Sequence, residues 1–174
     1  MTLRSLPDRS VGFHTEPRRS LTRLAVYMPL DHDIPFLHWM GASLLEWGPE
    51  VAVLSLEVEP RHLNRSGVVH GGIYAVLADA AGGLAGCHSD DPAHPRKAYT
   101  VSLTTNFLSA AAEGHITARG TLRRRGGRVY FSSIEITSDS GDLLALGEGS
   151  FLYRTHEGPR AEGDRAEVAA HHDE

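Results

Sequence analysis

Residues 64–86 read NRSGVVHGGIYAVLADAAGGLAG, and this stretch decides how the rest of the chain must fold. After the His-Gly-Gly turn at 70–72 the sequence is apolar or small, apart from one carboxylate, Asp79. It predicts a helix from residue 71 to about residue 86, and a helix without a polar face is normally buried. We therefore expect a sheet to wrap around this helix, with a second subunit covering what one sheet leaves open.

In such a helix Asp79 needs a hydrogen-bonding partner or a functional role, because a buried carboxylate loses its hydration. It is either functional or a structural residue bonded to backbone or to Ser or Thr. The turn at His70-Gly71-Gly72 favours function, since N–H groups at a helix N-terminus can hold a developing oxyanion. The alternative is a glycine-rich turn capped by His70. Asn64 either belongs to the same site or serves its loop as a turn residue.

The flanking segments predict an α+β domain with one antiparallel sheet against one dominant helix. A short helix is expected at 33–41 and a hairpin at 43–60, with its turn at Gly48-Pro49. Strands are expected at 99–108, 115–125, 129–139 and 143–154, joined by short turns. In the strand 99–108, alternation places Val101, Leu103, Thr105 and Phe107 on one face and Thr100, Ser102, Thr104 and Asn106 on the other.

Composition indicates three regions. Residues 1–30 hold five Arg against two acids and read as an N-terminal extension; residues 31–154 form the domain. Residues 155–174 hold two Arg against six acids and read as a disordered acidic tail. The net charge of −5 argues against a nucleic-acid partner. Without a signal-like start or a membrane-spanning run, and with Cys87 as the single cysteine, we expect a cytoplasmic protein with no membrane partner.

The motif Asn64-x2-Gly67-x2-His70-Gly71-Gly72-x6-Asp79 resembles the hotdog-fold acyl-CoA thioesterases of the phenylacetic-acid-degradation (PaaI-like) group. The likeness runs over residues 33–154. It implies an antiparallel sheet wrapped around the helix, and a homodimer or a dimer-of-dimers tetramer with active sites at the subunit interface. It implies no metal and no organic cofactor.

The resemblance also implies roles for individual residues. Asp79 matches the catalytic carboxylate, acting as general base on water or as nucleophile on the thioester. The Gly71 N–H matches the oxyanion donor, from the opposite subunit. Asn64 and His70 match residues that hold the thioester carbonyl, and Thr100 matches a Ser or Thr that positions water or the carboxylate.

The substrate implied is a small, medium-chain or aryl acyl-CoA. Gly72 lies where a ligand can approach the backbone, and the densest basic cluster is Arg123, Arg124, Arg125 and Arg128. These arginines either contact the coenzyme A phosphates or form a solvated hairpin tip. Arg96 and Lys97 are further candidates. Two other functions stay open: a non-catalytic acyl-CoA-binding or sensing module, and a hotdog hydratase or dehydratase.

Overall fold

The structure, a computed structural model, describes residues 34–90 and 96–154. The regions expected as an N-terminal extension (1–30) and an acidic tail (155–174) lie outside the described residues. The elements follow the expected order of short helix, hairpin, long helix and four strands. They are α1 (Pro35–Met40), β1 (Ala42–Gly48), β2 (Val51–Glu57), a 3-10 turn η1 (Pro60–His62), α2 (Gly71–Cys87), β3 (Ala98–Phe107), β4 (His115–Arg125), β5 (Val129–Ser138) and β6 (Leu143–Tyr153).

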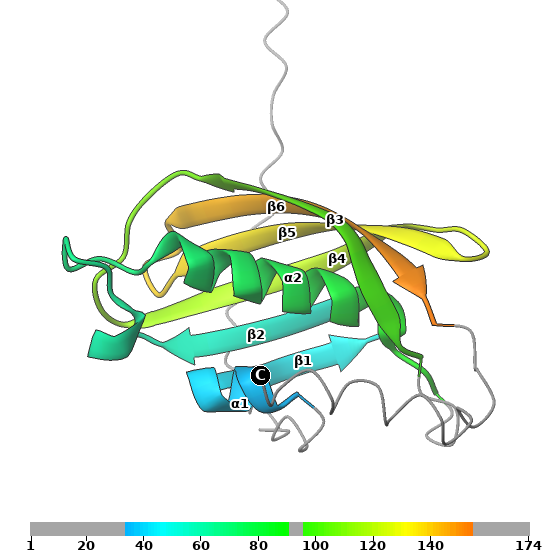
Figure 1. Ribbon diagram of the computed structural model, residues 1–174, viewed down its shortest axis with the longest axis horizontal. Coiled ribbons are helices and arrows are strands. Elements are labelled where there is room, and N and C mark those ends of the chain that lie inside the picture. Colours follow the sequence, from blue (N-terminus) through cyan, green and yellow to red (C-terminus); the bar gives the residue numbers. More distant parts are fainter. Residues whose placement is uncertain (1–33, 91–95, 155–174) are drawn as a thin grey trace, which may run out of the picture.

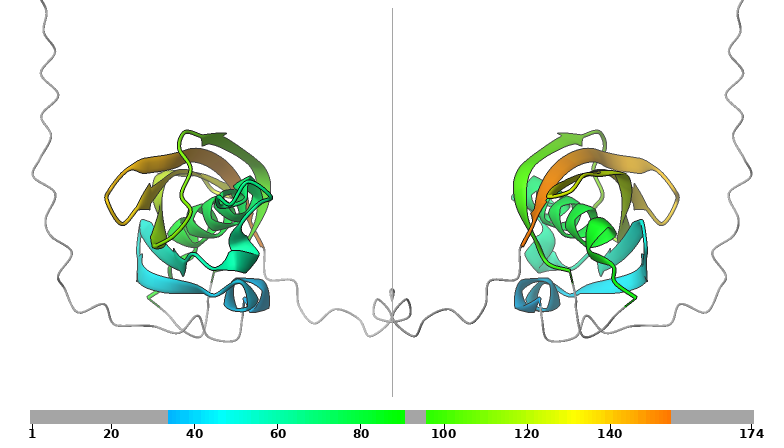
Figure 2. Two further views of the ribbon diagram at one scale, coloured as in Figure 1. Left: turned by 90° about the vertical axis from the view of Figure 1, so that its left-hand side faces the viewer. Right: turned by 90° about the vertical axis from the view of Figure 1, so that its right-hand side faces the viewer.

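The six strands form one sheet that curves around α2 (Figure 1). Every neighbouring pair is antiparallel, and the strand order is β1-β2-β4-β5-β6-β3. β3 therefore does not pair with β4, which follows it in the chain, but with β6 at the far edge of the sheet. The two end views in Figure 2 show the concave face of the sheet closing around the helix. The α+β class and the wrapped helix are confirmed.

The inner face of the sheet forms the core with one side of α2. Alternate residues of β2 and β4 are buried in this core, among them Leu54, Ile116 and Ala118, each 0% exposed. β4 crosses the helix so closely at Gly120 that a Cβ there would overlap the Ala81 carbonyl of α2. Glycine at 120 is thus a packing requirement, because it lets strand and helix backbones touch.

The C-terminal half of α2 is tied to the sheet through its carbonyl groups. The last four carbonyls of a helix, here including those of Leu84 and Gly86, have no helical partner, and a carbonyl within the helix can accept a second bond from a side chain. Here β1, β5 and β6 each supply donors: Ser132 Oγ to Gly82 O (2.8 Å), Tyr130 Oη to Gly83 O (2.5 Å), Trp47 Nε1 to Leu84 O (2.9 Å) and Tyr153 Oη to Gly86 O (2.9 Å). These bonds fix the register of α2 against the sheet.

The alternation expected for β3 fails at Val101. Thr100 pairs with Phe151 and Ser102 pairs with Ser150, so Val101 is an extra residue, a β-bulge. Its side chain is 62% exposed. The bulge turns Thr100 toward α2. The prediction that Thr100 and Ser102 share one face of the strand was therefore wrong. The pattern could not reveal this, because a bulge shifts the phase of alternation without changing composition.

Within residues 34–90 and 96–154, no helix is long and apolar enough to cross a membrane.

Candidate active site

The start of α2 leaves one backbone donor uncommitted. His70 is the N-cap residue, and its Nδ1 accepts the Gly72 N–H at 2.9 Å. The Ile73 N–H bonds to the His70 carbonyl at 2.9 Å. The Gly71 N–H has no acceptor among the described groups, and it lies at the positive end of the helix dipole. The turn therefore leaves the Gly71 N–H without an acceptor among the described groups, while the Gly72 N–H is occupied.

The His70 ring presents a second donor beside this N–H. Because Nδ1 accepts a backbone proton, the neutral ring carries its own proton on Nε2. His70 is exposed, so its ring lies at the surface. The capping role that was the alternative for His70 is real, and it fixes the tautomer that donation to a ligand requires.

Asn64 lies in the small loop that leads into the turn. Its Oδ1 accepts from the N–H groups of Ser66 (2.8 Å) and Val68 (3.4 Å), and its own N–H bonds to the Val68 carbonyl (2.7 Å). Gly67, with φ of 76°, closes the loop. Asn64 is thus a turn residue, and with Oδ1 committed its Nδ2 group has no acceptor among the described residues. The turn and ligand interpretations are compatible.

Asp79 lies in the middle of α2 and is half-buried in this chain. Thr100 Oγ1 donates to its Oδ1 at 2.6 Å, and no described cation pairs with the carboxylate. This bond fits a structural Asp as well as a functional one. Asp79 lies on the side of α2 that the sheet leaves uncovered, so it is partly accessible in the described chain.

That uncovered side is a stripe along α2. It carries Asp79 and the partly buried apolar residues Ile73, Val76, Ala80 and Leu84. The expectation that one sheet cannot cover the whole helix is therefore met in the described chain.

One chain does not bring all the expected site residues together. Asn64, His70 and Gly71 gather at the N-terminal end of α2, while Asp79 and Thr100 lie two helical turns further on. Asp79 lies eight positions after Gly71 in the helix, which is about 12 Å of axial rise. A single carbonyl group cannot touch both positions of the same chain.

The arginines of the β4–β5 hairpin are divided by a second bulge. The β4–β5 register shifts between Leu122 and Arg124. Arg123 Nε bonds to Ser133 Oγ at 2.6 Å, and Arg124 pairs with the outward Phe131. Arg125 instead pairs with buried Tyr130, on the face toward α2. Arg123 and Arg124 therefore belong to the outer face of the sheet and Arg125 to the inner one.

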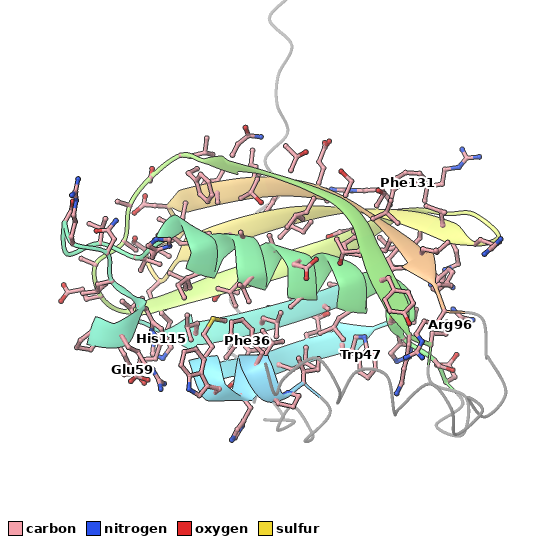
Figure 3. All side chains as sticks on the ribbon, in the orientation of Figure 1. Phe36, Trp47, Glu59, Arg96, His115 and Phe131 are labelled. Carbon is pink, nitrogen blue, oxygen red and sulfur yellow. The ribbon has the colours of Figure 1, made fainter. Side chains whose placement is uncertain are left out.

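Five cations lie on chain segments that meet near the C-terminal end of α2, and we call them the cationic cluster: Arg96, Lys97, Arg125, Arg128 and Arg154. Backbone bonds join their strands, from the Arg154 N–H to the Lys97 carbonyl (2.8 Å) and from the Tyr153 N–H to the Arg128 carbonyl (2.9 Å). Figure 3 shows Arg96 where β3 begins.

Positive charges of this cluster lower the pKa of a buried hydroxyl beside it. Burial raises the pKa of the Tyr153 hydroxyl, and the positive charges of Arg125 and Arg96 partly offset that rise. In the described part of the chain no carboxylate forms an ion pair with any of the five. The isolated Arg154 gave no sequence signal, because only strand pairing brings it beside Lys97.

His62 is a second residue that sequence reasoning missed. Its side chain is 2% exposed, and its backbone carbonyl accepts the His70 N–H at 2.8 Å. A lone His before a loop carries no signal of burial. Only the positions of α1 and η1 around the ring reveal its role.

Comparisons with known proteins identify similar chains. A model of the thioesterase superfamily matches residues 66–145. A putative esterase of Saccharolobus solfataricus is 33% identical over 105 residues, covering 60% of this chain and 73% of that protein. Acyl-coenzyme A thioesterase 13 of Mus musculus is 27% identical over 107 residues, covering 60% of this chain and 74% of that protein.

Solved structures share the fold. A mutant of the phenylacetic acid degradation protein PaaI from Thermus thermophilus is similar with a TM-score of 0.61 at 29% identity, covering 70% of this chain and 99% of that one. A thioesterase of Haemophilus influenzae is similar with a TM-score of 0.65 at 21% identity, covering 72% of this chain and 86% of that one.

Proposed function

The chain belongs to the thioesterase superfamily of hotdog-fold hydrolases, and from this premise we propose that it hydrolyses acyl-CoA thioesters to a free acid and coenzyme A. The substrate class is a small, medium-chain or aryl acyl-CoA, and the thioesterase domain is residues 31–154. The single observation that carries the proposal is the half-exposed Asp79 carboxylate, held by Thr100 on a helix whose first N–H is unoccupied. The proposed compartment is the cytoplasm, where Cys87 stays reduced.

The donors and the carboxylate act together when two copies of the chain meet. Because about 12 Å of helix separates Gly71 from Asp79, the thioester lies between Gly71 of one subunit and Asp79 of the other. The apolar stripe of α2 supports such a pairing, since it is left uncovered around Asp79. β3 is an edge strand with unpaired backbone groups, and its exposed Val101 and Phe107 suit burial against a second copy.

The chemistry follows from these positions. As general base, Asp79 takes a proton from water, and the water oxygen bonds to the thioester carbon. The carbonyl oxygen becomes an oxyanion, held by the Gly71 N–H with Asn64 Nδ2 and His70 Nε2–H as neighbouring donors; one good donor is worth about 2.7–4 kcal/mol of barrier. Collapse breaks the C–S bond, and the departing thiolate receives the proton from Asp79.

The nucleophilic alternative uses the same atoms in a different order. Asp79 attacks the thioester carbon, coenzyme A leaves, and water then hydrolyses the mixed anhydride. Single-turnover hydrolysis in H2¹⁸O separates the two routes, because only the anhydride route can place ¹⁸O in the Asp79 carboxylate when water attacks the aspartyl carbon.

The phosphates of coenzyme A are assigned to the cationic cluster rather than to the whole arginine run. Arg125 and Arg128 stay in this role, joined by Arg96, Lys97 and Arg154. Arginine binds phosphate well because its planar guanidinium matches the oxygens. Arg123 and Arg124 are not included among the phosphate-binding residues, since the bulge in β4 directs them to the outer face.

The test is thiol release from a panel of phenylacetyl-, benzoyl-, short-chain and medium-chain acyl-CoAs, run beside Asp79→Asn. The wild type should turn over at least one substrate, and folded Asp79→Asn should be slower by about 10²–10⁴-fold. Tight binding without turnover would replace this function with the acyl-CoA-binding module. Loss of the acyl C=C signal without thiol release would indicate a hydratase.

A further inference from the structure

His62 is a buried imidazole that the proposed chemistry does not use. Among the described residues, His62 and Ser132 are the buried polar side chains other than tyrosine and cysteine, at 2% and 3% exposure. The ring of His62 lies between the end of α1 and the turn η1. Glu59, whose N–H bonds to this ring, lies at the opposite end of the molecule from Arg96 (Figure 3).

Both ring nitrogens of His62 are occupied by backbone groups. The Glu59 N–H donates to Nδ1 at 3.0 Å, and Nε2 lies 2.9 Å from the Met40 carbonyl. A backbone N–H needs a bare nitrogen and a carbonyl needs an N–H, so these partners select the neutral ring with its proton on Nε2. A doubly protonated ring would set two donors against each other at Glu59.

The backbone of His62 is bonded directly to the turn at His70-Gly71-Gly72. Its carbonyl accepts the His70 N–H at 2.8 Å, and the bridge between Leu63 and Val69 closes the loop that both residues flank. Asn64 lies inside that loop, and Gly71 follows it directly. The direction of the Gly71 N–H therefore depends on where the His62 carbonyl sits, and the His62 ring fixes that carbonyl relative to α1.

A second anchor holds the opposite side of the same loop. The Val69 N–H bonds to the Ala111 carbonyl at 2.8 Å, and the Ala111 N–H bonds to the Tyr74 hydroxyl at 3.3 Å. Loss of the His62 ring thus leaves the loop attached through Ala111 but released from α1. The expected result is a displaced turn in a folded domain.

We propose that His62 is a positioning residue, whose neutral ring sets the Gly71 N–H and Asn64 in the geometry that the thioester needs. The inference rests on the proposed function, because it names what holds the donor side of that site. A displacement of about 1 Å in such a group can cost about 100-fold in rate.

The test compares His62→Leu, His62→Gln and Ser132→Ala in the full chain. His62→Leu removes both ring bonds, whereas the amide of Gln can still reach the Met40 carbonyl. Ser132→Ala is the matched control, since it deletes another buried bond to α2 (Ser132 Oγ to Gly82 O, 2.8 Å) far from the turn. Each variant is measured for Tm, kcat, KM and the amide NMR signals of Gly71 and Gly72.

We expect His62→Leu to lose about 10- to 100-fold in kcat with KM nearly unchanged. His62→Gln should recover part of that loss. Ser132→Ala should keep the wild-type kcat although its Tm falls about as much as that of His62→Leu. Equal kcat losses in His62→Leu and Ser132→Ala would overturn the inference, as would full activity in His62→Leu. If the wild type itself hydrolyses no acyl-CoA, the proposed function fails. The amide NMR signals of Gly71 and Gly72 then test whether His62 positions the turn. Shifted Gly71 and Gly72 amides in His62→Leu support it, and unshifted ones overturn it.

Discussion

Thr100 Oγ1 lies 2.6 Å from Oδ1 of Asp79, joining the edge strand β3 to the central helix α2. The bond exists because the bulge at Val101 turns Thr100 toward the helix. Bulges are frequent next to active sites, where they re-aim a side chain. One extra residue in an edge strand thus determines which group holds the carboxylate.

Thr100→Val should therefore slow turnover while leaving the fold intact. The substitution keeps the branched shape and removes the hydroxyl, and a hydrogen bond to a charged group contributes about 1.5–3 kcal/mol. We expect kcat to fall about 10-fold or more. Thr100→Ser keeps the donor and should stay within a few-fold of wild type. Wild-type rates in Thr100→Val would remove Thr100 from the site.

Two inactive variants should restore activity when mixed, if each site takes Asp79 from one subunit and Asn64 from the other. Asp79→Asn and Asn64→Ala are unfolded together and refolded as a mixture. Half the dimers are then mixed and carry one intact site each, so activity should return to about a quarter of wild type. A mixture as inactive as its parents would mean that each chain builds its own site.

Gly86→Ala should strongly destabilise the domain. A Cβ at position 86 would overlap the ring of Tyr130, which is itself 0% exposed and cannot move outward. Overpacking of this kind costs about 3 kcal/mol of unfolding free energy. Urea denaturation measures it, with Gly83→Ala as the control. At position 83 the nearest atom, in Phe151, lies 3.5 Å away, so alanine there should be neutral or mildly stabilising.

Arg125→Gln and Arg128→Gln should raise KM only for substrates that carry phosphates. With acyl-CoA we expect about a 10-fold rise in KM for each substitution, the equivalent of one charge-assisted hydrogen bond. With the same acyl group on N-acetylcysteamine, which lacks phosphates, KM should not change. Arg119→Gln is the control, because Arg119 on the same strand is paired with Glu46. A KM rise with both substrates would contradict phosphate recognition.

Stability should fall at alkaline pH. Burial raises the pKa of Cys87, Tyr74 and Tyr153, and raises that of Tyr130 far above its usual range. The folded state therefore holds these protons more tightly than the unfolded state. Its advantage is complete below the unfolded values, about 8.5 for Cys and 10 for Tyr, and is lost as pH rises through the folded ones.

The measurement is the free energy of unfolding by urea between pH 8 and 11. Tyr130→Phe removes the group with the largest rise in pKa, so its stability should decline less steeply over this range, whatever its absolute value. The same slope in the variant and the wild type would contradict a buried, protonated Tyr130.

Local pattern was enough to predict the helix and most strands. The apolar and small residues after His70 predicted α2 from residue 71, and alternating segments bounded by turn residues predicted the strands. Both signals depend on neighbours a few residues apart, so the sequence carries them directly. The motif from Asn64 to Asp79 likewise indicated the family, because the spacing of its residues is local.

The sequence by itself determined the buried helix, its glycine turn and its single carboxylate, since periodicity and turn chemistry act over short stretches of chain. Only the tertiary structure decided what surrounds them. Pairing of β3 with β6, and not with β4, put Lys97 beside Arg154, and the bulge at Val101 put Thr100 on Asp79. Strand partners and register are set by packing between residues far apart in the chain, and a shift of one residue exchanges the two faces of a strand.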